Sequence, residues 1–179
     1  DAVPLMPTLT EDFFANPTGS MVTVRTYPWQ AAGTVVLIGD AAHAVVPFYG
    51  QGANAGFEDC LELVEQVRQR PADLTAAFER YQSLRKPNSE AIADLALANF
   101  AEMRDHVASS SFRIRKRFEQ LLHRLFPRWF VPLYSMIAFS LIPYAQARTR
   151  AARQDRVVRS VGWVLGVLLV LALLATAFR

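Results

Sequence analysis

The sequence has little of what disulfide frameworks and metal centres require. It contains a single cysteine, Cys60, so no disulfide can form within the chain. Its three histidines, His43, His106 and His123, lie far apart and do not have the spacing of metal ligands. We therefore expect neither a disulfide-stabilised fold nor a metal site. We expect Cys60 to lie within a helix and to be buried in the protein core.

Acidic residues are scarce in the second part of the chain. Residues 106–179 carry 12 Lys/Arg but only two acidic residues, Glu119 and Asp155, whereas residues 1–105 carry 7 Lys/Arg and 14 Asp/Glu. A basic segment of this kind is typical of proteins that bind nucleic acid or an anionic membrane surface. The apolar end of the chain favours the membrane, so we expect no nucleic-acid partner.

Charged residues are absent between Val161 and Phe178. A run of about 18 apolar residues is close to the lower limit for a transmembrane helix, and a buried core helix is the alternative. The sequence predicts a basic juxtamembrane helix over 148–160 and a transmembrane anchor over 161–178, with the lipid bilayer as a partner. Because positive residues near a span stay on the cytoplasmic side, the preceding part should face the cytoplasm.

Two short segments have the pattern of strands. Met21–Tyr27 alternates and is rich in β-branched residues, and Thr34–Ile38 is an apolar run that suits a strand buried on both faces of a sheet. No glycine-rich phosphate loop follows an early strand. The chain is therefore expected to be the C-terminal part of a longer protein.

The rest of the chain is predicted to be mainly helical. Apolar spacing indicates helices over 53–70, 73–86 and 88–106, with Asp73 as an N-cap and Pro87 ending the second helix. A basic helix over 112–126 and shorter apolar helical pieces follow. The predicted class is an incomplete α/β fold: the last strands of a sheet, an α-helical C-terminal region and one transmembrane helix.

The stretch from Val36 to Cys60 carries the chemical information. A predicted buried strand delivers Asp40 at its carboxyl end, and a loop with Pro47, Gly50 and Gly52 then leads into a helix. Ligands of open α/β sheets bind at that edge, and a helix N-terminus offers unpaired N–H groups and a positive dipole end. The pattern predicts a site that accepts a polyol hydroxyl at Asp40 and stabilises negative charge near residues 52–54. The alternative is a strand–turn–helix in which Asp40 is only a cap.

This stretch resembles the second flavin motif of the class A flavoprotein monooxygenases, the para-hydroxybenzoate hydroxylase-like group. Within that group the chain is similar to the kynurenine 3-monooxygenase family over nearly its whole length to about residue 147. Ala53 departs from the Met expected there, a mild change because the backbone makes the contact. The segments that carry the resemblance are Val3–Leu9, Asn16–Thr18, Gly50–Cys60, Arg85–Asn88, Ala91–Leu97 and Pro132–Met136.

The resemblance implies roles for the loop residues in binding FAD. Asp40 would hydrogen-bond the ribityl chain, and Pro47 would line the isoalloxazine ring. The loop from Gly50 would place the backbone N–H groups of Gly52, Ala53 and Asn54 at the pyrimidine edge, where reduced flavin carries negative charge.

The resemblance also implies a substrate site. Phe48 and Tyr49 would border the substrate ring, while Asn99 and Tyr134 would bind the amino-acid head group. From the residues alone, Asn99 could equally be satisfied by neighbouring backbone and Tyr134 could be ordinary packing. No catalytic side chain is assigned. His43 is expected to be a structural partner of the loop, and Glu58 and Asp59 to be acids of the first helical turn.

The implied reaction is the hydroxylation of L-kynurenine to 3-hydroxykynurenine with FAD, NADPH and O2, through a flavin C4a-hydroperoxide. Domain limits follow: 1–32 ends a substrate-domain sheet, 33–70 completes the FAD-binding domain, and 71–147 covers the substrate site. This fragment alone is expected to be inactive. The resemblance implies that the membrane is the outer mitochondrial membrane in a eukaryote and the inner membrane in a bacterium. Two alternatives remain open: another class A hydroxylase acting on a phenolic or isoprenoid substrate, and a non-catalytic membrane-anchored relic.

Overall fold

The computed structural model describes residues 3–106 and 109–177 of the 179-residue chain. The described residues form seven α-helices, three short helical turns and two strands. In chain order the elements are η1 Val3–Leu5, α1 Leu9–Ala15, β1 Gln30–Ala31, β2 Val35–Val36, α2 Asp40–His43, η2 Pro47–Tyr49, α3 Gly52–Gln69, α4 Leu74–Ala101, the π-helix η3 Glu102–His106, α5 Ser110–Leu125, α6 Leu133–Ala138 and α7 Tyr144–Ala177.

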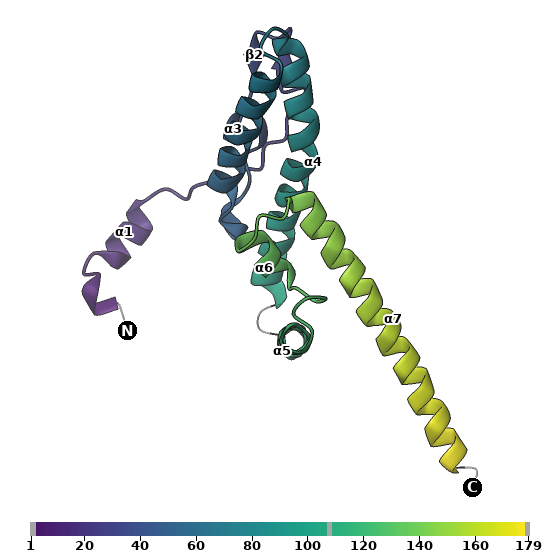
Figure 1. The fold of residues 1–179 in the computed structure, drawn as a ribbon. Helices are drawn as coiled ribbons and strands as arrows, with labels where there is room; N and C mark the ends of the chain where they lie inside the picture. The colour runs from purple at the N-terminus through teal and green to yellow at the C-terminus, as the bar shows by residue number, and fades with distance from the viewer. Residues whose placement is uncertain (1–2, 107–108, 178–179) are drawn as a thin grey trace.

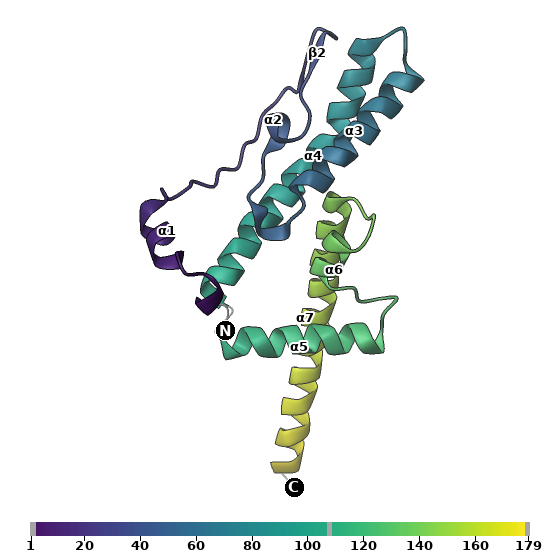
Figure 2. The same ribbon diagram turned by 90° about the vertical axis from the view of Figure 1, so that its left-hand side faces the viewer.

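A helical hairpin of α3 and α4 forms the centre of the molecule (Figure 1). The first part of α7 packs against α4, and α7 then runs away from the tip of the hairpin. Helix α5 lies across α7, and α1 stands apart at the end of a long extended segment (Figure 2). This arrangement leaves α2, η2 and the start of α3 on one side of α4.

The hairpin was only partly predicted. Asp73 is the N-cap of α4, because its Oδ1 accepts a hydrogen bond from the Ala76 N–H at 2.9 Å. The prediction that Pro87 ends the helix is wrong, because α4 continues through it to Ala101. Proline removes the N–H that would donate to the Ser83 carbonyl, but α4 is buried on both sides of the proline, and this packing keeps the helix continuous.

The predicted α/β class is wrong for the described residues, which are mostly helical. Strands β1 and β2 form a two-stranded antiparallel sheet that pairs Gln30 with Val36. The segment predicted as a strand over 21–27 is extended but has no strand partner; its Val24 and Thr26 N–H groups donate to carbonyls at 44 and 42. Val35 is 56% exposed. A strand is buried on both faces only inside a covered sheet, which these residues do not build.

The predicted transmembrane helix over 161–178 is also not supported. Among the described residues, no helix is long and apolar enough to cross a membrane. Helix α7 runs without a break from Tyr144 to Ala177, and its first half carries five arginines. Phe178, together with the side chains of residues 165 and 169–177, lies outside what the structure describes.

Two buried clusters form the core. One joins α4 to α6 and α7 and includes Ile92, Met136 and Tyr144; the other places Trp29 against Ala42 and Tyr81. Helix α3 turns its buried residues Ala55, Asp59 and Gln66 inward, so its regularly spaced apolar residues do not form the core face. Consequently Phe57, Leu61 and Val64 are 65–74% exposed, and Cys60 is exposed instead of buried.

Candidate functional site

The loop between β2 and α3 contains two glycines in left-handed conformations. Gly39 has φ 55° and Gly50 has φ 65°, a region that residues with a Cβ rarely adopt. Asp40 follows Gly39 directly and is the first residue of α2. It therefore begins a short helix instead of ending a buried strand, and its side chain is exposed.

The N-terminus of α3 is open to solvent. Gly52, Ala53 and Asn54 form its first turn, whose N–H groups have no carbonyl partner within the helix. Ala53 and Asn54 are exposed, and a Cβ at Gly50 would meet no atom within 4 Å. The backbone here can be approached closely by an electron-rich ligand group. This end of α3, with the exposed Asp40 carboxylate nearby in the chain, fits the FAD contacts that the resemblance implies.

A buried ion cluster fixes both parts of this loop, and the sequence analysis missed it. Asp59 is fully buried, and its Oδ2 accepts hydrogen bonds from the Gly39 N–H at 2.9 Å and from His43 Nε2. Its Oδ1 accepts from Arg85 Nε at 2.7 Å. Arg85 also donates to the Ala55 carbonyl at 3.1 Å. One carboxylate therefore ties α2, α3 and α4 together.

The protonation of this cluster follows from its contacts. Burial by itself raises the pKa of Asp59, but hydrogen bonds from His43 and Arg85 outweigh it, so the pKa lies below its ordinary value. Burial disfavours the charged form of Arg85, yet Asp59 and Glu58 hold its pKa above the ordinary value. Asp59 is thus a buried carboxylate, where we had predicted a dipole-favoured acid of the first turn. The expectation that His43 is a structural partner agrees with its bond to Asp59.

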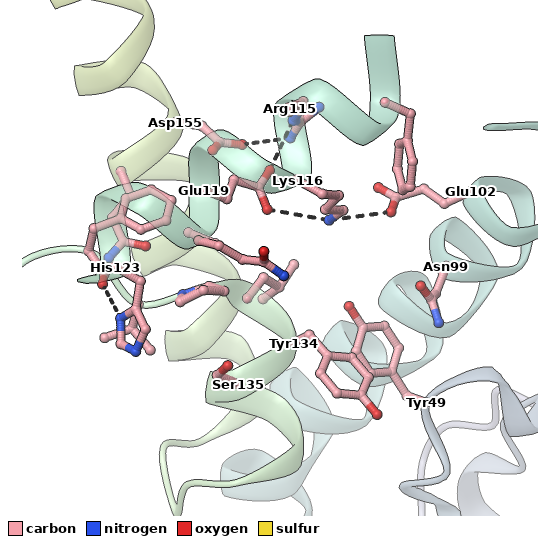
Figure 3. Close-up of a pocket in the computed structure, with 18 of the residues that line it drawn as sticks. Tyr49, Asn99, Glu102, Arg115, Lys116, Glu119, His123, Tyr134, Ser135 and Asp155 are labelled. Carbon is pink, nitrogen blue, oxygen red and sulfur yellow. Dashed lines mark hydrogen bonds and ion pairs between the residues drawn. The ribbon is translucent and has the colours of Figure 1, made fainter. Parts of the chain in front are cut away.

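A cavity of about 490 Å³ brings together three of the four predicted substrate residues (Figure 3). Tyr49 from η2, Asn99 from α4 and Tyr134 from α6 all line it. The rings of Tyr49 and Tyr134 are stacked, with centroids 5.8 Å apart. Because Tyr49 immediately precedes Gly50, this cavity adjoins the open start of α3.

Asn99 connects α4 to the loop. Its Nδ2 donates to the Phe48 carbonyl at 2.7 Å, so part of the amide is satisfied by backbone, as the alternative reading of the sequence allowed. Phe48 itself packs on Phe100, with ring centroids 4.5 Å apart, and is not among the lining residues of the cavity. The fourth predicted substrate residue is therefore not part of the cavity lining.

One wall of the cavity is charged, and the sequence analysis missed it too (Figure 3). Lys116 on α5 lies 3.4 Å from Glu119 and 3.8 Å from Glu102 on η3. Arg115 contacts Glu119 at 3.0 Å and Asp155 of α7 at 3.7 Å. These residues come from three separate helices, so only the tertiary fold brings them together. Their spacing in the sequence gave no signal beyond a basic helix.

The charged wall affects the tyrosine opposite. Burial, followed by the negative charge of Glu102 and by Tyr134, raises the pKa of Tyr49 to about 12. The Tyr49 hydroxyl is therefore neutral at physiological pH and can donate a hydrogen bond. The cavity thus combines stacked aromatic rings, an amide and groups of both charges, which suits a ligand with an aromatic ring and a polar head.

Comparisons with known proteins agree with these features. Residues 11–96 match the model of a family described as "FAD binding domain". A kynurenine 3-monooxygenase from Salinispora arenicola (strain CNS-205) is 49% identical over 100% of this chain and 39% of the relative. One from Myxococcus xanthus (strain DK1622) is 49% identical over 88% of this chain and 34% of the relative, and one from Flavobacterium psychrophilum (strain ATCC 49511 / DSM 21280 / CIP 103535 / JIP02/86) is 41% identical over 90% and 36%. The chain spans about two fifths or less of the length of these relatives. It belongs to the kynurenine 3-monooxygenase family.

Proposed function

We propose that this chain is part of an FAD- and NADPH-dependent monooxygenase that converts L-kynurenine to 3-hydroxykynurenine. The observation that carries the proposal is the cavity shared by Tyr49, Asn99 and Tyr134 beside the open N-terminus of α3. The similarity to kynurenine 3-monooxygenases supports the choice of substrate. The rest of the site would come from residues outside this chain, so we expect the fragment alone to be inactive.

The residues of the loop would hold the cofactor. The Asp40 carboxylate would accept a hydrogen bond from a ribityl hydroxyl, and Pro47 would lie against the flavin ring. The N–H groups at residues 52–54 would face its electron-rich edge and stabilise negative charge there. Bound FAD would supply the redox chemistry that transfers one oxygen atom of O2 after reduction by NADPH.

The residues of the cavity would hold the substrate. Tyr49 is neutral and would donate a hydrogen bond, while Asn99 and Tyr134 would bind the amino-acid head. Phe48 would support the ring from behind through its contact with Phe100. We assign no acid or base among the side chains of this chain: they position the reactants and exclude water.

The cavity favours an amino-acid substrate over the alternatives. A wall with both signs of charge, Glu102 beside Lys116, suits a zwitterionic head group better than a phenol or an isoprenoid. A non-catalytic relic would have no reason to keep Gly39 and Gly50 in left-handed conformations above an intact ion cluster.

The experiment uses the full-length protein loaded with FAD. Asn99→Ala and Tyr134→Phe should each raise KM for kynurenine, on the order of tenfold, because each removes a hydrogen bond to the head group of the substrate. FAD content should not change. Tyr27→Phe is the matched control, because Tyr27 is 65% exposed and lies outside the cavity. Wild-type KM in both cavity variants would remove these residues from the substrate site.

A further inference from the structure

The outer face of α5 is apolar and exposed. Ile114, Phe118, Leu121 and Leu125 recur at intervals of four, three and four residues, so they form one stripe along the helix. They are 66%, 47%, 49% and 60% exposed. Such a stripe would normally be buried against another element.

The opposite face of α5 is the one that contacts the body of the protein. Lys116, Glu119 and His123 line the cavity (Figure 3). At about 100° per residue, these three positions lie on the opposite side of the helix from Phe118 and Leu121. The stripe therefore faces away from the cavity. Phe118 at its centre also borders a groove with α7, and the stripe is otherwise exposed in the described part of the chain.

Positive charge accompanies the stripe. Arg113, Arg117 and Arg124 lie along one flank of it by the same helical geometry, and all three are exposed. The two acidic residues of the segment 106–179 are on the other side of α5, where Glu119 and Asp155 pair with Arg115. The outward side of α5 is thus apolar along its centre and cationic along its edge.

We propose that the outer face of α5 docks on an anionic lipid surface, with the helix lying in the plane of the headgroups. The inference concerns a different surface from the segment 161–178 and requires no helix to cross the bilayer. A strongly amphipathic helix with Phe and Leu on one face and arginines beside it is the type that binds at such an interface. The arginines would contact lipid phosphates while the stripe enters the acyl boundary.

Other occupants fit this surface less well. Nucleic acid could bind the arginines, but it would leave the apolar stripe exposed to water. A second copy of α5 would bring arginines of the same sign together. Helix α5 lies across α7 on the outside of the helical body, where a large surface can reach it (Figure 2).

The test measures co-sedimentation of the full-length, FAD-loaded protein with vesicles. Vesicles of phosphatidylcholine alone are compared with vesicles that contain roughly one quarter phosphatidylserine. The wild-type protein should bind the anionic vesicles more strongly, and added salt should weaken that binding. Arg117→Gln/Arg124→Gln should lower the partition coefficient on anionic vesicles by roughly tenfold or more, since each basic residue contributes at the surface.

Two further variants complete the test. Phe118→Ser/Leu121→Ser should weaken binding by roughly tenfold or more, through loss of the buried apolar area. Arg68→Gln/Arg80→Gln is the matched charge control, because both arginines are exposed on the distant α3–α4 hairpin, and it should bind like wild type. FAD content shows that each variant is folded.

If both α5 variants bind anionic vesicles as wild type does, or if wild type has no preference for them, the proposal is wrong. Unchanged binding with lower stability of the Phe118/Leu121 variant would indicate that another part of the longer protein covers the stripe.

Discussion

The buried carboxylate of Asp59 gives the sharpest prediction about what holds the site together. Asp59→Asn keeps the shape of the side chain but removes the charge that faces Arg85. An uncompensated partner of a buried ion pair costs about 3–5 kcal/mol. Arg85 keeps Glu58 at 2.6 Å and the Ala55 carbonyl, so we expect the loss of unfolding free energy to be smaller, roughly 2–3 kcal/mol.

The acid dependence of stability provides a second readout of the same substitution. Because the folded pKa of Asp59 lies below its unfolded value of about 4, the carboxylate stabilises the fold above that pH. This contribution is lost as the pH falls through the lower folded pKa. In Asp59→Asn the acid-dependent contribution should be missing, so the difference from wild type should shrink as the pH is lowered.

The assay is urea denaturation of the full-length protein at neutral and at acid pH. Glu65→Gln is the control, because Glu65 forms an exposed ion pair with Arg68, and this substitution should leave the unfolding free energy nearly unchanged. The reasoning would be refuted by an Asp59→Asn protein within about 0.5 kcal/mol of wild type at neutral pH. An unchanged acid dependence would contradict the pKa assignment in particular.

Three further predictions concern the loop and the hairpin. Asp40→Ala should weaken FAD binding by roughly ten- to a hundredfold through loss of a charge-assisted hydrogen bond, and flavin titration that gives the wild-type affinity would contradict the assignment. Gly50→Ala should lower the unfolding free energy by about 1 kcal/mol, because φ is 65° while the added Cβ has room; a thermal melt that matches wild type would argue against this backbone. Asp73→Ala should cost about 1 kcal/mol in denaturant unfolding through loss of the cap, with Asp12→Ala on exposed α1 as a near-neutral comparison.

Local signals predicted helix α3 and the start of α4, but they did not predict how far α4 extends. Helix α3 and the cap at Asp73 follow from spacing and side-chain chemistry that lie within a few residues of one another. Pro87 was predicted to end a helix because its local effect is unfavourable. Packing on both sides of it, which the sequence does not reveal, carries α4 through.

The prediction of a buried strand was wrong for a related reason. A run such as Thr34–Ile38 has the composition of a buried strand, but burial depends on neighbouring strands that these residues do not supply. The apolar face of α3 is the same case, since Phe57 and Leu61 have the pattern of a core face yet lack a covering element among the described residues. Periodicity shows which residues could form a buried face. That face is buried only where a neighbouring element covers it.

The candidate site also contains residues that could be predicted from local sequence and residues that could not. The loop around Gly50 and Gly52 was predicted from its residues, while the roles of Asn99 and Tyr134 came only from the resemblance. Asp59 and Arg85 are 26 residues apart in the chain, and nothing in their spacing indicated that they pair. Contacts of this kind become visible only when the helices are packed.

The measurement that most directly tests the central claim is product formation by the full-length protein with FAD, NADPH and O2. We predict that L-kynurenine is converted to 3-hydroxykynurenine, identified by chromatography against a standard, and that a simple phenol in its place gives no hydroxylated product. Asp40→Ala should lose this activity along with its flavin. Absence of 3-hydroxykynurenine from the flavin-loaded wild-type protein, or hydroxylation of the phenol in preference to kynurenine, would contradict the account.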